Sequence, residues 1–271
     1  MVIRVTIFFS FIFSAITSFA QKDTSFRLLK TFLTDVSNLA VDNLDNIYLL
    51  SSTNQLKKIS PAGDSIASYN NTKRFGTLHS IDVSNPLKII LFHKDFSTIV
   101  ILDRLLSERA SIDLRKHNIV QVSSVGLSYD NNIWIFDEYD NKLKKLDENG
   151  NILLETSDFR TAYNQSFLPQ QIIDHNNLVY LYDPSNGILV LDHYGTFKRK
   201  IPITQWKSIS INDKYISGIF NNAISYYNTS TLQQYQHNFP QSFHGFNNYI
   251  IANSKLFAMN KDSVNIYSFN F

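Results

Sequence analysis

Side chains with catalytic or metal-binding chemistry are few in this sequence and widely separated. The shortest gap between two histidines is seven residues, so no pair has the close helical or strand spacing of a zinc site. The histidines are His79, His93, His117, His175, His193, His237 and His244. Acid–base catalysis would need the fold to bring distant groups together, and one set to consider is His79, Asp82 and His244.

Other sequence patterns of catalysis and cofactor binding are missing. The chain has no Gly-x-Ser-x-Gly segment, and its 8 glycines form no phosphate-binding loop. It has no cysteine, so it carries neither a disulfide nor a cysteine-linked lipid. We therefore expect no cofactor, no bound metal and no nucleotide.

The first 20 residues predict an export signal. Arg4 precedes an apolar run that ends at Phe13, and a tract of small residues follows and ends at Ala20. The apolar run is too short for a spanning helix. We expect residues 1–20 to be a signal peptide and residues 21–271 to form one domain. The protein is then expected in the periplasm or outside the cell, with no membrane span after cleavage.

The expected mature domain is close to neutral. Arg4 is the only charged residue of the signal, so 24 Lys and Arg remain against 23 Asp and Glu. Such a balance gives no electrostatic reason to expect a nucleic acid or an anionic membrane as partner. The 21 Phe and 14 Tyr are explained by packing in a strand-rich core.

The elements that would position any site repeat along the chain. A pattern of β-branched or aromatic strands separated by polar turns recurs six times, and the segments Asn54–Ile59 and Asn141–Leu146 are nearly the same. The first core-facing residue of each second strand marks the period. These markers are Ile47, Leu87, Ile133, Leu178, Tyr215 and Leu256. Their mean spacing is about 42 residues, which suits a four-stranded propeller blade.

The two ends of the chain predict how the repeats close into a ring. The strands of the first copy are expected at 37–42, 46–51, 55–60 and 65–69. The sixth copy runs out after its third strand, Ser263–Phe269, whereas an orphan strand, Phe26–Leu33, precedes the first copy. We expect this N-terminal strand to become the outermost strand of the last blade, so that no open joint remains. The predicted fold is all-β: a six-bladed β-propeller with four-stranded blades.

The copies resemble those of six-bladed β-propellers of the NHL and TolB-like kind across residues 21–271. The third copy, Leu127–Leu154, is the closest. Lactonase-like propellers hold a channel Ca²⁺ with Glu, Asp and Asn, and such a cation needs several charged oxygens. The innermost strands here are expected to open with Asn38, Ser80, Ser124, Gln170, Ser208 and Asn248. Asp82 is the only carboxylate expected nearby, so the sequence predicts no channel metal.

Propellers usually bind partners in the central channel or on the face formed by the turns between second and third strands and by the connections between blades. In this chain those loops contain Arg, Tyr and Phe, which are enriched at protein interfaces. The connection Asp158–Pro169 is the longest and is our first candidate for a contact. The candidate partner-binding residues are Arg74, Phe75, His79, His93, Asp95, Asp137, Glu138, Tyr139, Arg160, Tyr163, Asp183 and His244.

Three functions fit these observations. The leading hypothesis is a non-enzymatic cell-envelope module that binds another protein. The composition of the chain resembles that of envelope proteins of the Bacteroidota. In these bacteria such a module could be an accessory or plug subunit of a type IX-like outer-membrane translocon. The first alternative is a hydrolase or lyase at the channel mouth. The second is a carbohydrate or peptide binder that stacks its ligand on Trp134, Trp206 or Tyr163, although core packing explains both tryptophans.

Overall fold

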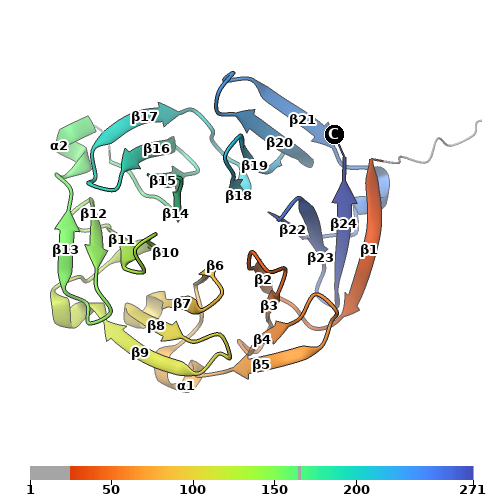
Figure 1. Ribbon diagram of the computed structural model, residues 1–271, viewed down its shortest axis with the longest axis horizontal. Helices are drawn as coiled ribbons and strands as arrows, with labels where there is room; N and C mark the ends of the chain where they lie inside the picture. Colours follow the sequence, from red (N-terminus) through yellow and green to blue (C-terminus); the bar gives the residue numbers. More distant parts are fainter. Residues whose placement is uncertain (1–24, 164–165, 271) are drawn as a thin grey trace, which may run out of the picture.

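Six four-stranded antiparallel sheets form a ring around a central opening (Figure 1). The structure, a computed structural model, describes residues 25–163 and 166–270. The expected signal peptide, residues 1–20, lies outside the described residues. In each sheet the first strand lies at the opening and the fourth at the rim. This arrangement confirms the predicted six-bladed β-propeller, and we number the blades 1 to 6 in chain order.

The first three blades follow one another directly in the chain, and their strands are given from the opening outward. Blade 1 contains β2 (Asn38–Val41), β3 (Ile47–Leu50), β4 (Leu56–Ile59) and β5 (Ser65–Tyr69). Blade 2 contains β6 (Ser80–Asn85), β7 (Lys88–His93), β8 (Thr98–Leu102) and β9 (Glu108–Asp113). Blade 3 contains β10 (Val122–Leu127), β11 (Ile133–Asp137), β12 (Lys142–Leu146) and β13 (Ile152–Glu155).

Blades 4 and 5 repeat this order, and blade 6 takes its outermost strand from the start of the chain. Blade 4 contains β14 (Gln171–His175), β15 (Leu178–Asp183), β16 (Gly187–Asp192) and β17 (Phe197–Ile201). Blade 5 contains β18 (Lys207–Ile211), β19 (Tyr215–Phe220), β20 (Ala223–Asn228) and β21 (Gln234–Asn238). Blade 6 contains β22 (Asn248–Ala252), β23 (Lys255–Met259), β24 (Ser263–Phe269) and β1 (Phe26–Leu33).

The pairing of β1 with β24 closes the ring. The two strands run antiparallel, from Phe26 opposite Phe269 to Leu33 opposite Ser263. They lie side by side at the right of Figure 1. Both strands have the bounds expected from the sequence, and the predicted closure by the N-terminal strand is confirmed. Without β1 the edge of β24 would be a row of unpaired backbone groups.

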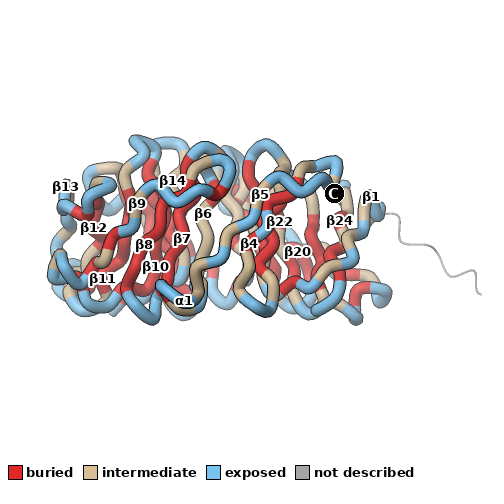
Figure 2. Tube along the Cα trace, turned by 90° about the horizontal axis from the view of Figure 1, so that it is seen from below, coloured by how far each residue is buried: buried red, intermediate tan, exposed pale blue. Residues whose placement is uncertain are grey.

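The ring has two different faces. One carries the turns between second and third strands and the connections between blades, and we call it the inter-blade face. The short helices lie on it: α1 (Thr72–Phe75), η1 (Lys94–Phe96), η2 (Leu114–His117), α2 (Phe159–Tyr163) and η3 (Gln241–Phe243). The other face, which carries the remaining turns, we call the hairpin face. Seen from the side, exposed turns border both faces and the buried strands lie between them (Figure 2).

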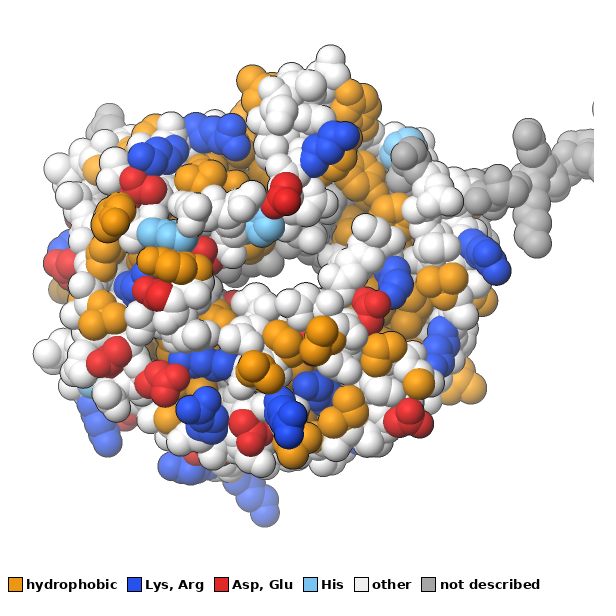
Figure 3. Space-filling view, in the orientation of Figure 1, with side chains coloured by type: hydrophobic (Ala, Val, Ile, Leu, Met, Phe, Trp, Pro, Cys, Tyr) orange, Lys and Arg blue, Asp and Glu red, His pale blue; other side chains and the backbone are white. Residues whose placement is uncertain are grey.

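The hairpin face is the one turned toward the viewer in Figure 3. Acidic and basic side chains alternate over it, and hydrophobic side chains are scattered around the central opening. This face therefore shows no single charged patch.

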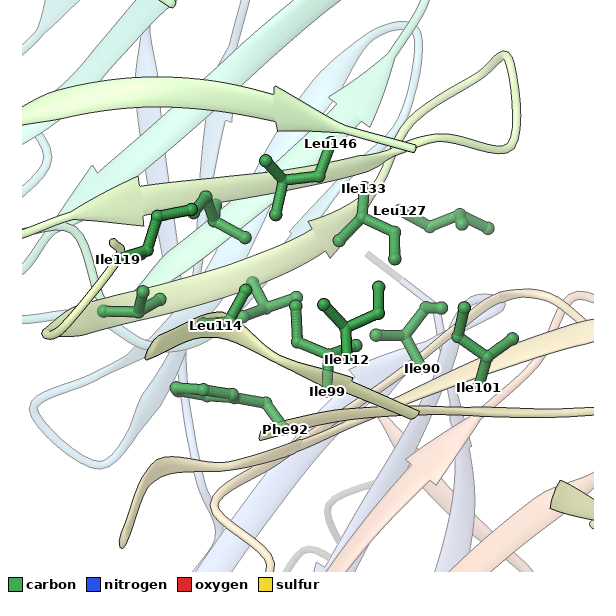
Figure 4. Close-up of a cluster of buried hydrophobic side chains, with 13 residues drawn as sticks. Ile90, Phe92, Ile99, Ile101, Ile112, Leu114, Ile119, Leu127, Ile133 and Leu146 are labelled. Carbon is green, nitrogen blue, oxygen red and sulfur yellow. The ribbon is translucent and has the colours of Figure 1, made fainter. Parts of the chain in front are cut away.

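The core consists of six hydrophobic clusters, one at each interface between neighbouring blades. Strand β7 shows how they arise. Ile89 and Leu91 belong to the cluster shared with blade 1, whereas Ile90 and Phe92 belong to the cluster shared with blade 3, because successive side chains point to opposite faces of a sheet. A blade packed on both faces therefore needs a strand that is apolar throughout. Figure 4 shows the cluster between blades 2 and 3.

Hydrogen bonds within the turns explain why Asp and Gly recur between the third and fourth strands. Asp147 follows the third strand β12, and Asp192 ends the third strand β16. Each accepts hydrogen bonds from two backbone N–H groups of the following turn, at 2.8–3.0 Å. Gly150 and Gly195 complete these turns with φ of 87° and 80°, in the region that favours glycine. These contacts stabilise the two hairpin turns.

One marker of the repeat was wrong. Leu87 was expected to face the core, but it lies in the turn before β7 and its side chain is 63% exposed. The Asn85 side chain accepts the Leu87 backbone N–H at 2.9 Å and forms this turn. The first apolar core residue of the strand is Ile89. The error leaves the period almost unchanged, because it displaces one marker by two residues.

Candidate interaction face

All twelve residues predicted to bind a partner lie on the inter-blade face. Eleven of them lie on the part of the ring that runs from α1 to blade 4. The twelfth, His244, is exposed and follows η3 in the connection between blades 5 and 6. The structure therefore brings most of the predicted residues to one side of one face.

Polar contacts join the loops of blades 2, 3 and 4. Lys94 pairs with Glu138 at 3.1 Å across the interface between blades 2 and 3. The Arg160 guanidinium donates to the carbonyl oxygens of Tyr139 and Asp140, at 3.4 and 3.2 Å, and so connects the next inter-blade loop. We call this surface the blade 2–4 arc and define it by its exposed residues, Arg74, Phe96, Val120, Tyr139, Arg160 and Leu168.

The arc is rich in exposed apolar surface. Phe96, Val120, Tyr139 and Leu168 are 43%, 65%, 77% and 48% exposed. Single exposed apolar residues are common on protein surfaces, but here four of them come from consecutive loops that contact one another. Arg160 contacts one of them, because its guanidinium donates to the Tyr139 carbonyl oxygen. Aromatic and arginine side chains of this kind dominate binding at protein interfaces.

A buried ion pair supports the most exposed residue of the arc. Lys144 Nζ lies 2.8 Å from Asp137 Oδ2, and the two side chains are only 4% and 2% exposed. The other oxygen of Asp137 accepts the backbone N–H groups of Tyr139 and Asp140 at 3.0 and 3.2 Å. Burial lowers the pKa of Lys144, but its bonds to Asp137 and Asp140 outweigh burial and leave that pKa raised. Tyr139 therefore projects from a fixed turn.

Two predicted histidines have lowered pKa values. Burial lowers the pKa of His79, and the charge of Lys94 lowers it further. His93 is 3% exposed, and one of its ring nitrogens lies 3.2 Å from the Gly76 carbonyl oxygen. Burial again lowers its pKa. The Asp95 carboxylate accepts the Thr77 hydroxyl at 2.7 Å, and this bond lowers the pKa of Asp95.

Three other predicted residues support the loops from beneath. Phe75 is 6% exposed and packs in the interface between blades 1 and 2. Asp183 is 3% exposed and accepts the backbone N–H of Leu168 at 2.9 Å. Tyr163 is half-buried, with its ring 5.1 Å from the ring of Phe159. Their roles are structural, and a partner would reach the arc through the residues that they position.

The carboxylate of the set proposed for hydrolase or lyase chemistry, Asp82, is bound by backbone amides. Both oxygens of Asp82 are occupied by backbone N–H groups, of Ser84 at 2.8 Å and of Leu127 at 2.7 Å. Within residues 25–163 and 166–270, no hydrogen bond or ion pair joins Asp82 to His79 or His244. The same residues contain no group of three or more His, Asp or Glu side chains that could hold a metal ion.

Neither tryptophan is available as a stacking surface. Trp134 is fully buried and Trp206 is 4% exposed, so the expectation that both pack in the core is confirmed. The indole N–H of Trp134 donates to Asp174 Oδ2 at 3.0 Å.

Asp174 also corrects the sequence analysis, which recognised Asp82 as the only carboxylate near the innermost strands. Asp174 lies on the innermost strand β14, and its other oxygen is 2.9 Å from His193 Nε2. The His193 ring stacks on Tyr129 at 3.9 Å with an interplanar angle of 5°. A sequence signal existed, because a buried indole N–H needs an acceptor and Asp174 follows Trp134 by about one repeat.

No family model matches this chain, and no curated protein matches it by sequence. Among solved structures it resembles virginiamycin B lyase from Staphylococcus aureus, with a TM-score of 0.63, 12% identity and coverage of 90% of this chain and 100% of the lyase. It also resembles the Pan2 WD40 domain of Neurospora crassa, with a TM-score of 0.64, 10% identity and coverage of 91% and 96%.

A third similar structure is BamB from Moraxella catarrhalis, with a TM-score of 0.55, 10% identity and coverage of 90% of this chain and 100% of BamB. At these identities the likeness extends to the fold alone. The comparisons therefore confirm the resemblance to propellers at the level of the fold. A lyase, a WD40 domain and BamB share this fold, so the function of this chain must be argued from its own surface residues. Among the described residues, none of the helices has the length and apolar character to cross a membrane.

Proposed function

We propose that this chain is a non-enzymatic protein of the cell envelope that binds another protein through the blade 2–4 arc. The observation that carries the proposal is the exposed apolar surface of Phe96, Val120, Tyr139 and Leu168 on loops that are cross-linked by polar contacts. A rigid surface loses little conformational entropy on binding. The proposal also includes export by residues 1–20 and a location in the periplasm or outside the cell.

The finer part of the proposal concerns the assembly. A rigid disc that offers one face to a partner would suit an accessory or plug subunit of an outer-membrane translocon, and the type IX kind is our specific suggestion. The Bacteroidota-like composition supports it by association only. The enzyme alternative would use Asp82, whose two oxygens each accept one backbone N–H group.

The test compares two exposed tyrosines on opposite faces. Tyr139 in the arc is 77% exposed, and Tyr194 on the hairpin face is 82% exposed. Each is replaced by alanine in a tagged chain, which is then purified from the envelope fraction of its own host. A central interface tyrosine contributes about 2 kcal/mol, or roughly a 30-fold change in affinity. We expect a stoichiometric partner with the unmodified chain and with Tyr194→Ala, and little of it with Tyr139→Ala.

Two outcomes would count against the proposal. One is that no stoichiometric partner copurifies with the unmodified chain. The other is that Tyr194→Ala loses the partner while Tyr139→Ala retains it, which would place the contact on the hairpin face. Unchanged thermal unfolding of both variants shows that any loss of binding comes from the surface and not from the fold.

A further inference from the structure

A pocket of about 390 Å³ lies between blades 5 and 6 on the inter-blade face, outside the blade 2–4 arc. Three loops form it: the connection that precedes β18, the turn between β19 and β20, and the connection that precedes β22. Of its lining, the sequence analysis named only Asn248, as the opening residue of an innermost strand. Its volume is at the small end of the range for sites that bind small molecules, roughly 300–1,000 Å³.

Carboxamide side chains dominate the wall of this pocket. Five carboxamides and no carboxylate line it. One of them, Asn248, accepts the Tyr249 backbone N–H at 2.9 Å. The other four are Gln205, Asn221, Asn222 and Asn247. The backbone beneath them is fixed: the N–H groups of Gln205 and Asn247 each donate to a carbonyl oxygen at 2.8 Å. Within the described part of the chain, the terminal amides of these four side chains have no hydrogen-bond partner. Four donor-and-acceptor groups on a fixed frame are thus free to bind a ligand.

The backbone at the rim has unusual conformations. Asn221 and Asn222 have φ of 47° and 58° and form a two-residue hairpin turn, where asparagine is well tolerated. Gln205 has φ of 62°, which is uncommon for a residue other than Gly, Asn or Asp. Such conformations cluster at binding sites, where the surrounding structure holds them in place. Here they set the positions of three of the four free amides.

An aromatic ring and one cation complete the pocket. Phe246 is half-buried, and its ring lies 6.2 Å from that of Tyr249 at an angle of 71°, so it is held by edge-to-face packing. Lys207 is the only charged residue in the lining. No ion pair of Lys207 occurs among residues 25–163 and 166–270.

We propose that this pocket binds a saccharide of one or two rings, with a preference for a sugar that carries a carboxylate. A sugar hydroxyl both donates and accepts, and a carboxamide offers a matching acceptor and donors. The apolar face of a sugar ring can pack on Phe246, and the free ammonium of Lys207 would pair with a uronic acid group. Lys207 and Tyr249 belong to the edge strands β18 and β22, so the preference for a saccharide rests on the side-chain amides and on Phe246.

The test measures binding of four probes, glucose, galactose, N-acetylglucosamine and glucuronic acid, to the purified chain by saturation-transfer NMR titration. A single shallow site is expected to bind with a dissociation constant of about 1 mM. The pocket variant combines Asn222→Gly with Asn247→Ala, because glycine keeps the positive φ of the turn while it removes the amide. The matched control is Asn177→Gly, in a turn with the same paired positive φ on the hairpin face.

The proposal predicts saturable binding of at least one probe, a loss of tenfold or more in the pocket variant, and unchanged binding in Asn177→Gly. Lys207→Gln should weaken glucuronic acid several-fold more than glucose. Absence of saturable binding for all four probes, or equal affinity in the pocket variant, would overturn it. The pocket variant leaves the blade 2–4 arc unchanged, so it should still bind the protein partner of the proposed function. Loss of saccharide binding with the partner retained therefore tests the pocket alone.

Discussion

Replacing Lys144 by methionine removes the positive charge beneath the Tyr139 turn. The side chain is almost fully buried, and its loss leaves the Asp137 carboxylate, 2% exposed, without a countercharge. Breaking a buried ion pair from one side costs about 3–5 kcal/mol. For a chain of this size about 2–4 °C of melting temperature corresponds to 1 kcal/mol, so we expect the midpoint to fall by roughly 6–20 °C.

A matched control on the same strand is Lys142→Met. Lys142 pairs with Glu155 at 3.0 Å, but these side chains are 26% and 45% exposed. An exposed pair contributes at most about 1 kcal/mol, so the control should lose no more than about 4 °C. The double variant Asp137→Asn with Lys144→Met should recover part of the loss, because no charge remains buried and the amide oxygen can still accept the turn N–H groups.

Thermal unfolding followed by circular dichroism measures all three variants. The reasoning predicts a large difference between Lys144→Met and Lys142→Met, and partial recovery in the double variant. Equal midpoints for the two single variants would refute it, since they would show that the turn beneath Tyr139 does not depend on this ion pair.

Two further predictions concern ring closure and pH. A chain that begins at Thr34 lacks β1 and exposes the edge of β24, so it should melt earlier and self-associate in size-exclusion chromatography; a monomer with an unchanged midpoint would contradict the closure. The folded protein holds His79 and His93 with lowered pKa, so the unfolded chain takes up protons first as the pH falls below about 6.5, and stability decreases there. His93→Gln should lose less stability than the unmodified chain between pH 7.5 and 5.5 in urea unfolding; an equal loss would exclude His93 as a cause.

The fold could be predicted from the sequence because its determinants are periodic. Strands apolar on both faces recur at about 42 residues, and a ring of packed blades buries such strands throughout. Counting the strands showed that the sixth copy lacks a fourth strand, so Phe26–Leu33 could be assigned to that place. Leu87 failed as a marker because a single apolar residue in a turn looks like a strand residue until its turn hydrogen bond is known.

The site could be predicted only in part. Loop positions follow from the repeat, so the face of Tyr139 and Arg160 was predictable, whereas their exposure was not. The roles of Asp137 and Asp183 depend on backbone amides that face them in three dimensions. The pocket between blades 5 and 6 joins residues up to 44 positions apart, Gln205 to Tyr249, and its free amides have no sequence signature.

The most direct test of the central claim is site-specific photocrosslinking in the native host. A photoreactive phenylalanine analogue replaces Tyr139 in one strain and Tyr194 in another, and the two side chains are similarly exposed on opposite faces. Binding through the blade 2–4 arc predicts a discrete crosslinked protein from position 139 and none from position 194. A crosslink from position 194 alone, or from neither position, would contradict it.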